Sequence, residues 1–216
     1  MYLESGKSIL FIEERLVNEG GEPVDLMWGH HIAFGLPFLE GGAVIDAPAR
    51  RLLVDEAMPG FEPRLLKAGQ DATWPIAEGS GGKPVDMSRI PPQGQTGYRE
   101  MAYLTDFSAG WIALTNPGRQ VGFGLRFDPD HFRYVWLWEE LGAGTGYPWW
   151  KRWYAVALEP WTSYPTSGLL EAIARGTQLT LAPDQEVEAW LQAIAYDGIS
   201  GVSHITASGQ VMGRGQ

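Results

Sequence analysis

The sequence contains no cysteine among its 216 residues, so disulfide frameworks and thiolate metal sites are excluded. It also has no run of about 18 apolar residues, the length that a membrane-spanning helix requires. The first residues lack the basic and then apolar segments of a secretory signal. We therefore expect a cytoplasmic protein with no membrane partner.

Positive charge is scarce. The chain has 16 Lys and Arg residues against 26 Asp and Glu residues, which gives a net charge of −10 and a pI of about 4.8. Such a surface repels the phosphate backbone of nucleic acids and anionic lipid head groups. The composition predicts that nucleic acid is not a partner.

Helical periodicity is rare, whereas short extended segments recur between turn residues. Glycine (28) and proline (15) are plentiful and dispersed, as in chains built from many strands. We predict a single all-β domain over residues 1–216, a large antiparallel β-sandwich with little helix. Strands are expected at 8–18, 24–34, 43–55, 101–106, 110–116, 121–127, 134–139, 153–161, 178–181 and 187–196, a helix at 167–175, a long surface loop at 76–97 and a frayed tail at 203–216.

Glu159 ends an apolar strand in the segment Tyr154–Pro165. Strand alternation predicts that Ala155, Ala157 and Glu159 share one face of a sheet, while Tyr154, Val156 and Leu158 share the other. Two alanines beside the glutamate would leave room for a ligand. Poor solvation there would raise the pKa of the carboxyl group toward use as a general base.

The second notable segment is Trp28-Gly29-His30-His31-Ile32-Ala33-Phe34. Adjacent histidines on an extended segment point to opposite faces, so only one of them can face a given cleft. The ten tryptophans of the chain serve either as core residues or as flat platforms that suit the apolar face of a sugar ring.

These segments carry a resemblance to the galactose-mutarotase-like (aldose 1-epimerase) family. His31-Ile32-Ala33-Phe34 is similar to the family's His-x-x-Phe segment, and Leu158-Glu159-Pro160-Trp161 is similar to its late Leu-Glu-Pro segment. The preceding strand, with Glu13-Glu14-Arg15 and Asn18, resembles the family's Glu-Arg-x-x-Asn strand. The segment from Leu179 to Gln185 resembles the strand and turn that follow the glutamate, so the similarity covers about residues 3–196.

The resemblance implies a sugar-binding β-sandwich that interconverts sugar anomers by ring opening. Glu159 would be the base and His31 the acid, roughly 6–9 Å apart across one sugar ring, and no metal or cofactor would be needed. The other substrate-binding candidates are His30, Trp28, Phe34, Trp138, Trp161 and Asp106, with Glu139 as a second candidate for the acidic residue that holds sugar hydroxyls.

Family members carry further N-terminal sequence, so we expect this chain to lack the family's N-terminal strands. An exposed sheet edge near residues 1–18 would follow, and exposed edges tend to pair. We therefore predict self-association, most simply as a homodimer.

Three other interpretations stay open. The main one is a non-catalytic carbohydrate-binding module with the same fold. A cupin-like metal site would use His30, His31, His131 and Glu139, although adjacent histidines rarely ligate one metal. A glycoside hydrolase would need two carboxylates about 5–10 Å apart, from Glu139, Glu140 and Glu159.

Overall fold

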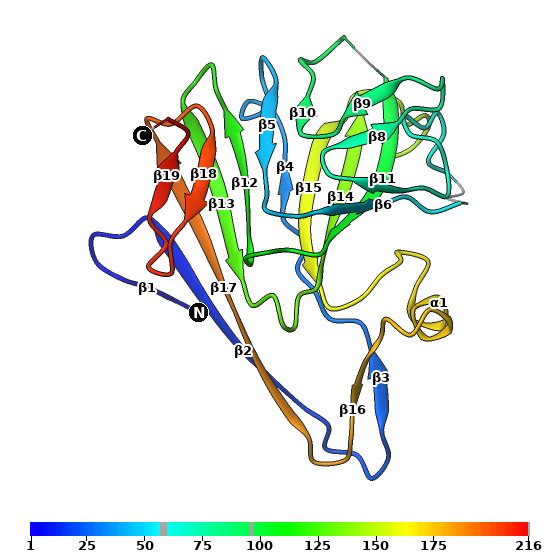
Figure 1. Cartoon of the computed structure of the whole chain (residues 1–216), viewed down its shortest axis with the longest axis vertical. Coiled ribbons are helices and arrows are strands. Elements are labelled where there is room, and N and C mark those ends of the chain that lie inside the picture. The colour runs from blue at the N-terminus through cyan, green and yellow to red at the C-terminus, as the bar shows by residue number, and fades with distance from the viewer. Residues whose placement is uncertain (57–59, 96, 216) are drawn as a thin grey trace.

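Two antiparallel sheets face each other in the computed structural model, which describes residues 1–56, 60–95 and 97–215 (Figure 1). The larger sheet has the strand order β1 (Tyr2–Leu3), β2 (Ile9–Val17), β17 (Glu186–Asp197), β13 (Val121–Phe127), β12 (Trp111–Asn116), β5 (Ala43–Asp46), β10 (Arg89–Ile90). The smaller sheet has the order β4 (Ala33–Phe34), β15 (Tyr154–Trp161), β14 (Tyr134–Leu141), β11 (Tyr98–Thr105), β6 (Arg51–Leu53), β7 (Asp71–Thr73).

Within the described ranges, three short strand pairs and one helix complete the architecture. The pairs are β3 (Val24–Leu26) with β16 (Leu179–Leu181), β8 (Ile76–Glu78) with β9 (Pro84–Asp86), and β18 (Val202–Ile205) with β19 (Val211–Gly213). The helix α1 (Leu169–Ala174) confirms the helix expected at 167–175. The predicted antiparallel β-sandwich with little helix is confirmed.

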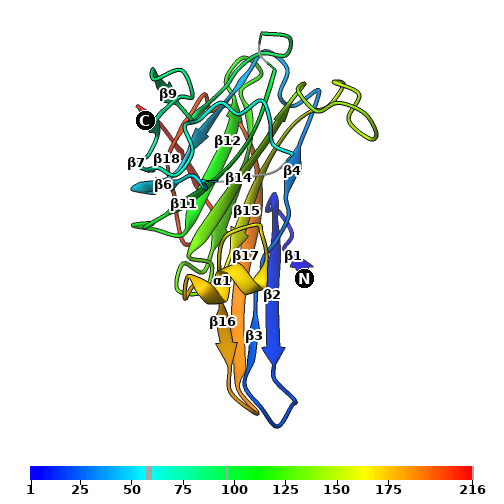
Figure 2. The ribbon, with the colours of Figure 1, turned by 90° about the vertical axis from the view of Figure 1, so that its right-hand side faces the viewer.

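The main core lies between the two sheets and follows from the period-2 pattern of the strands. Ile112 and Leu114 of β12 are fully buried, and they belong to the same apolar cluster as Leu137 of β14 and Leu158 of β15. Because alternate residues of a strand point to opposite faces, the smaller sheet also has an outer face, which points away from this core. Figure 2 shows the molecule from the side of the smaller sheet and α1.

Two segments that were each predicted to be one strand prove to be two. The chain of residues 24–34 forms β3 and β4, which pair with different partners, β16 and β15. Residues 43–55 contribute β5 to the larger sheet and β6 to the smaller one, and Pro48 lies in the crossing between them. Alternation alone could not reveal these crossings, because both halves of each segment are extended and apolar.

The predictions of a long loop at 76–97 and of a frayed tail at 203–216 were wrong for the residues that the structure describes, and residues 96 and 216 lie outside these. The first segment forms the β8–β9 hairpin and β10, and it buries Ala77, Met87 and Ile90. The tail forms part of the β18–β19 hairpin, whose Val202 and Ile205 belong to a second apolar cluster with Trp111. A few well-spaced apolar side chains anchor each segment despite its high glycine content.

None of the helices in the described ranges is long and apolar enough to cross a membrane.

Candidate functional site

The outer face of the smaller sheet carries Glu159. On β15, Val156 and Leu158 belong to the core between the sheets, whereas Ala157 and Glu159 point to the other side. Cross-strand register places Glu159 opposite Trp136 and places Ala157 opposite Trp138. The predicted alternation along β15 is therefore confirmed.

Two side chains hold the carboxylate of Glu159, which is only 2% exposed. The indole Nε1 of Trp161 donates a hydrogen bond of 3.1 Å to Oε2, and Nε2 of His31 lies 3.3 Å from Oε1. Burial raises the pKa of the Glu159 carboxyl group, while the Trp161 hydrogen bond and the His31 side chain act in the opposite direction. The balance favours a carboxylate that accepts a proton more readily than an exposed glutamate does.

Trp161 is fixed by stacking and by a close approach to the backbone. Its ring lies parallel to that of Trp136, with centroids 4.2 Å apart and an interplanar angle of 11°. Gly29 forms a bridge with Trp161, and a Cβ atom at Gly29 would lie 2.2 Å from Cδ2 of the indole. Only glycine admits the indole at this distance, so Gly29 contributes to the orientation of the Glu159 carboxylate.

His31 approaches Glu159 from the solvent side. Its side chain is 64% exposed, and its ring centroid lies 6.4 Å from that of Trp138. The expected convergence of His31 and Glu159 is observed. Their separation of 3.3 Å is shorter than the expected 6–9 Å, because the exposed imidazole folds directly onto the carboxylate.

His30 and Trp28 point away from Glu159, on the opposite side of the extended segment. His30 Nε2 lies 2.9 Å from Glu14 Oε2, and its ring packs edge-on against Phe132, 5.5 Å away. Trp28 packs against the same fully buried Phe132 at 5.3 Å. The structure thus separates these two substrate-binding candidates from the Glu159 face. Trp28 and His30 are two residues apart on an extended segment, so they point to one side, whereas Gly29 and His31 point to the other.

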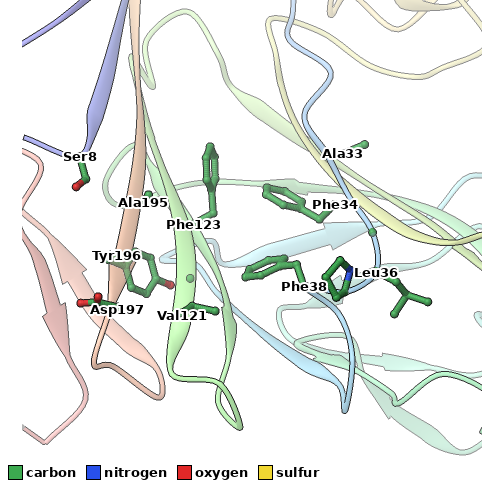
Figure 3. A pocket seen from close by; sticks show the side chains of 13 residues that line it. Ser8, Ala33, Phe34, Leu36, Phe38, Val121, Phe123, Ala195, Tyr196 and Asp197 are labelled. Atoms are coloured by element: carbon green, nitrogen blue, oxygen red, sulfur yellow. The ribbon is translucent and has the colours of Figure 1, made fainter.

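Phe34 also faces the space between the sheets. It pairs with Val156, an inward-facing residue of β15, and its ring packs against Phe38 and Phe123 at 5.7 and 5.2 Å. Figure 3 shows these three rings in a cavity of about 680 Å³ between β4 and β13. The structure does not bring Phe34 to Glu159, because Ala33 is the outward residue of β4.

The two candidates for holding sugar hydroxyls lie elsewhere. Asp106 follows β11 on the exposed surface, and its Oδ2 lies 3.9 Å from Nη1 of Arg50. Glu139 points into the core and is 1% exposed, and within the described part of the chain neither of its carboxylate oxygens has a hydrogen-bond partner. Burial raises the pKa of Glu139 to about 8, although the nearby Tyr98 side chain acts in the opposite direction.

The residues of the two other enzyme-like interpretations are dispersed. Of the metal-site candidates, His30 meets Glu14, His31 meets Glu159 and His131 meets Asp128. Of the carboxylate pairs, Glu140 lies four residues along the sheet from Glu159 and one strand across, which corresponds to about 14 Å. That separation exceeds what either glycosidase geometry uses.

Several residues of this face were missed from the sequence. Trp136 lies two residues before Trp138 on β14, so alternation from Trp138 would have placed both rings on the Glu159 face. Trp149, from the loop after β14, lies 6.1 Å from Trp138 and packs against the guanidinium of Arg99. No local sequence pattern predicts these contacts of Trp149, because they depend on how the loop folds back over the sheet.

Comparison with solved structures identifies the architecture as the galactose-mutarotase-like fold. A candidate aldose 1-epimerase from Klebsiella pneumoniae superimposes with a TM-score of 0.62 at 19% identity, covering 89% of this chain and 44% of that one. A candidate aldose 1-epimerase from Escherichia coli K12 gives 0.57 at 15% identity, with coverages of 88% and 57%. A galactose mutarotase-like protein from Lactobacillus casei gives 0.55 at 14% identity, with coverages of 89% and 60%.

The chain belongs to the family described as "Domain of unknown function (DUF4432)", whose model matches residues 1–193. No protein with a curated description matches the sequence. The chain spans about half the length of the solved structures it matches first, from 44% to 57% of each. At these identities the structural likeness concerns the fold, and activity has to be argued from the side chains of the site.

Proposed function

We propose that this protein is an aldose 1-epimerase-like enzyme that interconverts the anomers of a reducing sugar. The observation that carries the proposal is the contact between Glu159 and His31, 3.3 Å apart on an aromatic face of the sheet. A buried carboxylate and an exposed imidazole give two proton-transfer groups at one place. The names of the similar structures, which are candidate aldose 1-epimerases and mutarotase-like proteins, support a sugar as the ligand.

The proposed reaction needs only proton transfers. Glu159 takes the proton of the anomeric hydroxyl, and His31 donates a proton to the ring oxygen while the bond between the anomeric carbon and that oxygen breaks. The resulting aldehyde rotates about its bond to the next carbon. Ring closure on the other face returns the two protons, so the protein ends the cycle unchanged.

The environment of Glu159 suits the role of base. Burial raises its pKa, so it takes up a proton more readily than an ordinary glutamate. The Trp161 hydrogen bond keeps the carboxylate aimed at one position. In this proposal, the exposed imidazole of His31 turns away from Oε1 to admit the sugar, which packs against Trp138 and Trp161.

The alternative is a carbohydrate-binding module that binds at the same face without turnover. It would use the same aromatic rings, but the close His31–Glu159 contact would then be only structural. A raised carboxyl pKa beside an exposed histidine favours the enzyme, because binding a neutral sugar alone has no need of two proton-transfer groups.

Two-dimensional exchange NMR on equilibrated reducing sugars separates the two. The probes are glucose, galactose, mannose, xylose and their 6-phosphates where these exist, each with and without protein. The enzyme proposal expects anomer exchange of at least one sugar at rates well above the uncatalysed ones. Saturation transfer from protein to sugar with no added exchange in any of them would support the binding module instead.

A further inference from the structure

A second cavity, of about 630 Å³, opens on the same face of the smaller sheet as Glu159. Its floor is formed by the end of β6, and its walls come from β7 and from the segment that carries α1. The side chains that give it its character are Arg51, Asp55, Asp71, Tyr164, Glu171 and Arg175. Its volume lies within the usual range of small-molecule sites.

Cross-strand register connects this cavity to Glu159. Glu159 pairs with Trp136, and Trp136 pairs with Tyr103, on three adjacent strands. Tyr103 pairs with Leu53, and Leu53 pairs with Asp71. Directly paired residues of antiparallel strands point to the same face, so Glu159 and the cavity lie on one row. With about 4.8 Å between strands, that row runs for about 19 Å from Glu159 to Asp71.

Aromatic side chains line the way between the two sites. Trp161 stacks on Trp136, whose ring meets Tyr103 at 5.8 Å. Tyr164 in turn packs against Tyr103 at 5.2 Å and forms part of the cavity wall. Tyr103 is fully buried, whereas Trp161 and Tyr164 are half-buried and present ring surface on the outer side. Such rings suit the apolar faces of consecutive sugars.

The polar groups of the cavity suit neutral hydroxyl groups. Arg175 Nη1 lies 2.9 Å from Asp55 Oδ1 and its Nε lies 2.9 Å from Glu171 Oε1, while Arg51 pairs with Asp71. Paired guanidinium and carboxylate groups offer donors and acceptors side by side, which a sugar hydroxyl can use together. These five residues carry three carboxylates and two guanidinium groups, and the whole chain has a net charge of −10. This excess of negative charge disfavours an anionic ligand.

We infer that the protein binds a neutral oligosaccharide along this row, with the reducing end at Glu159 and a distal sugar in the cavity of Arg51, Asp71 and Arg175. This inference rests on the proposed function for the orientation of the ligand. One strand spacing is close to the width of one sugar ring, so about four sugar units span the row. The substrate class is then a short oligosaccharide rather than a free monosaccharide.

The test measures affinity against chain length. Soluble, reducing malto-, cello-, manno-, galacto- and xylo-oligosaccharides of one to four units are titrated by ligand-observed NMR against the whole chain. In at least one series we expect the tetrasaccharide to bind at least about tenfold more tightly than the monosaccharide. In R51A/D71A that ratio should fall close to one, because the distal sugar loses two of its polar partners in the cavity. The double variant removes both members of an exposed ion pair together, so it leaves no unpaired charge and should cost little stability.

A matched control and a second variant keep the result interpretable. K67A/E78A removes another exposed ion pair that lies outside the cavity, and it should preserve the ratio of affinities. S167W fills the cavity from its exposed wall and leaves the ion pairs of the cavity in place, and it should lower the ratio as R51A/D71A does. Affinity that does not rise with length in any series, or a rise that survives both cavity variants, would overturn the inference.

Failure of the proposed function gives a different result. If the protein binds tetrasaccharides through the cavity but does not exchange anomers, the epimerase proposal is wrong and this inference stands. If the protein exchanges anomers but its affinity does not rise with chain length, the epimerase proposal stands and this inference is wrong.

Discussion

The indole of Trp161 donates a 3.1 Å hydrogen bond to the carboxylate of Glu159, two residues earlier on the same strand. The donor is itself held by a parallel stack on Trp136. A carboxylate at the end of a strand is thereby kept in one orientation, buried and facing a histidine.

We expect Trp161→Phe to keep most of the stack on Trp136 and to lose the donor. The hydrogen bond favours the charged carboxylate, so its loss raises the pKa of Glu159 further. The base works only when charged, and activity is lost as pH falls through that pKa. The acid limb of kcat/KM against pH should therefore move to higher pH, and kcat should fall by about tenfold. An unmoved acid limb would show that the indole does not act on Glu159.

The close approach at Gly29 gives a matched pair of variants. Gly29→Ala places Cβ 2.2 Å from the Trp161 ring and must displace it, whereas Gly35→Ala meets its nearest atom at 3.8 Å, an ordinary contact. We expect Gly29→Ala to weaken sugar binding and to destabilise the protein by about 1–3 kcal/mol, as overpacking does. Gly35→Ala should change both by little. Thermal unfolding and the quenching of tryptophan fluorescence by sugar check this, and equal effects of the two variants would contradict it.

The buried carboxyl group of Glu139 should make stability depend on pH. Its pKa is raised from 4.5 to about 8, so the folded state holds the proton more tightly than the unfolded state. The favourable contribution is complete below about pH 4.5 and is lost as pH rises toward 8. The difference corresponds to at most about 5 kcal/mol.

We therefore expect Glu139→Gln, which stays neutral, to match the wild type near pH 4.5 and to exceed its free energy of unfolding above pH 8 by a few kcal/mol. Urea unfolding at a series of pH values measures this. Glu19→Gln, at an exposed turn position, is the control and should show no such trend. A constant difference between Glu139→Gln and wild type across the range would mean that Glu139 is charged in the folded protein throughout.

Self-association remains a prediction about the edge of the larger sheet. The edge strand β1 is only two residues long, and it pairs with β2 at Phe11 and Leu10, so β1 leaves residues 12–17 of β2 unpaired on that side. We expect an isologous dimer through this edge. Glu13→Pro, at an exposed position inside that unpaired stretch, should shift sedimentation toward the monomer, with Glu19→Gln again as the control. A wild-type protein that sediments as a monomer at every accessible concentration would contradict the prediction.

Much of the sheet structure could be predicted because alternation and turn residues act locally. The strand around Glu159 and the opposite directions of His30 and His31 follow from the period of two. The sequence alone does not show which sheet each strand joins or which strand it pairs with. Phe34 falls on the inner face because β4 pairs Ala33 with Ala157, a register set by contacts far apart in the chain.

The same limit explains the missed segments. Ile90, Val202 and Ile205 are isolated apolar residues in stretches rich in glycine and polar residues, so their local composition is typical of loops. Their burial against β5 and Trp111 depends on long-range packing. The burial of the Glu139 carboxyl group could not be predicted for the same reason. Strand alternation shows which residues share a face with Glu139, but only long-range packing shows that this face is buried.

The role of Glu159 is tested most directly by exchange NMR on Glu159→Gln with the sugar that the wild type turns over. Glutamine keeps the shape of the side chain and its partner Trp161 but removes the base. We expect mutarotation to fall by about 10²-fold or more while the affinity for the sugar stays within a few-fold, and His30→Ala, whose ring points away from the site, to retain most of the activity. Normal anomer exchange by Glu159→Gln would contradict the account.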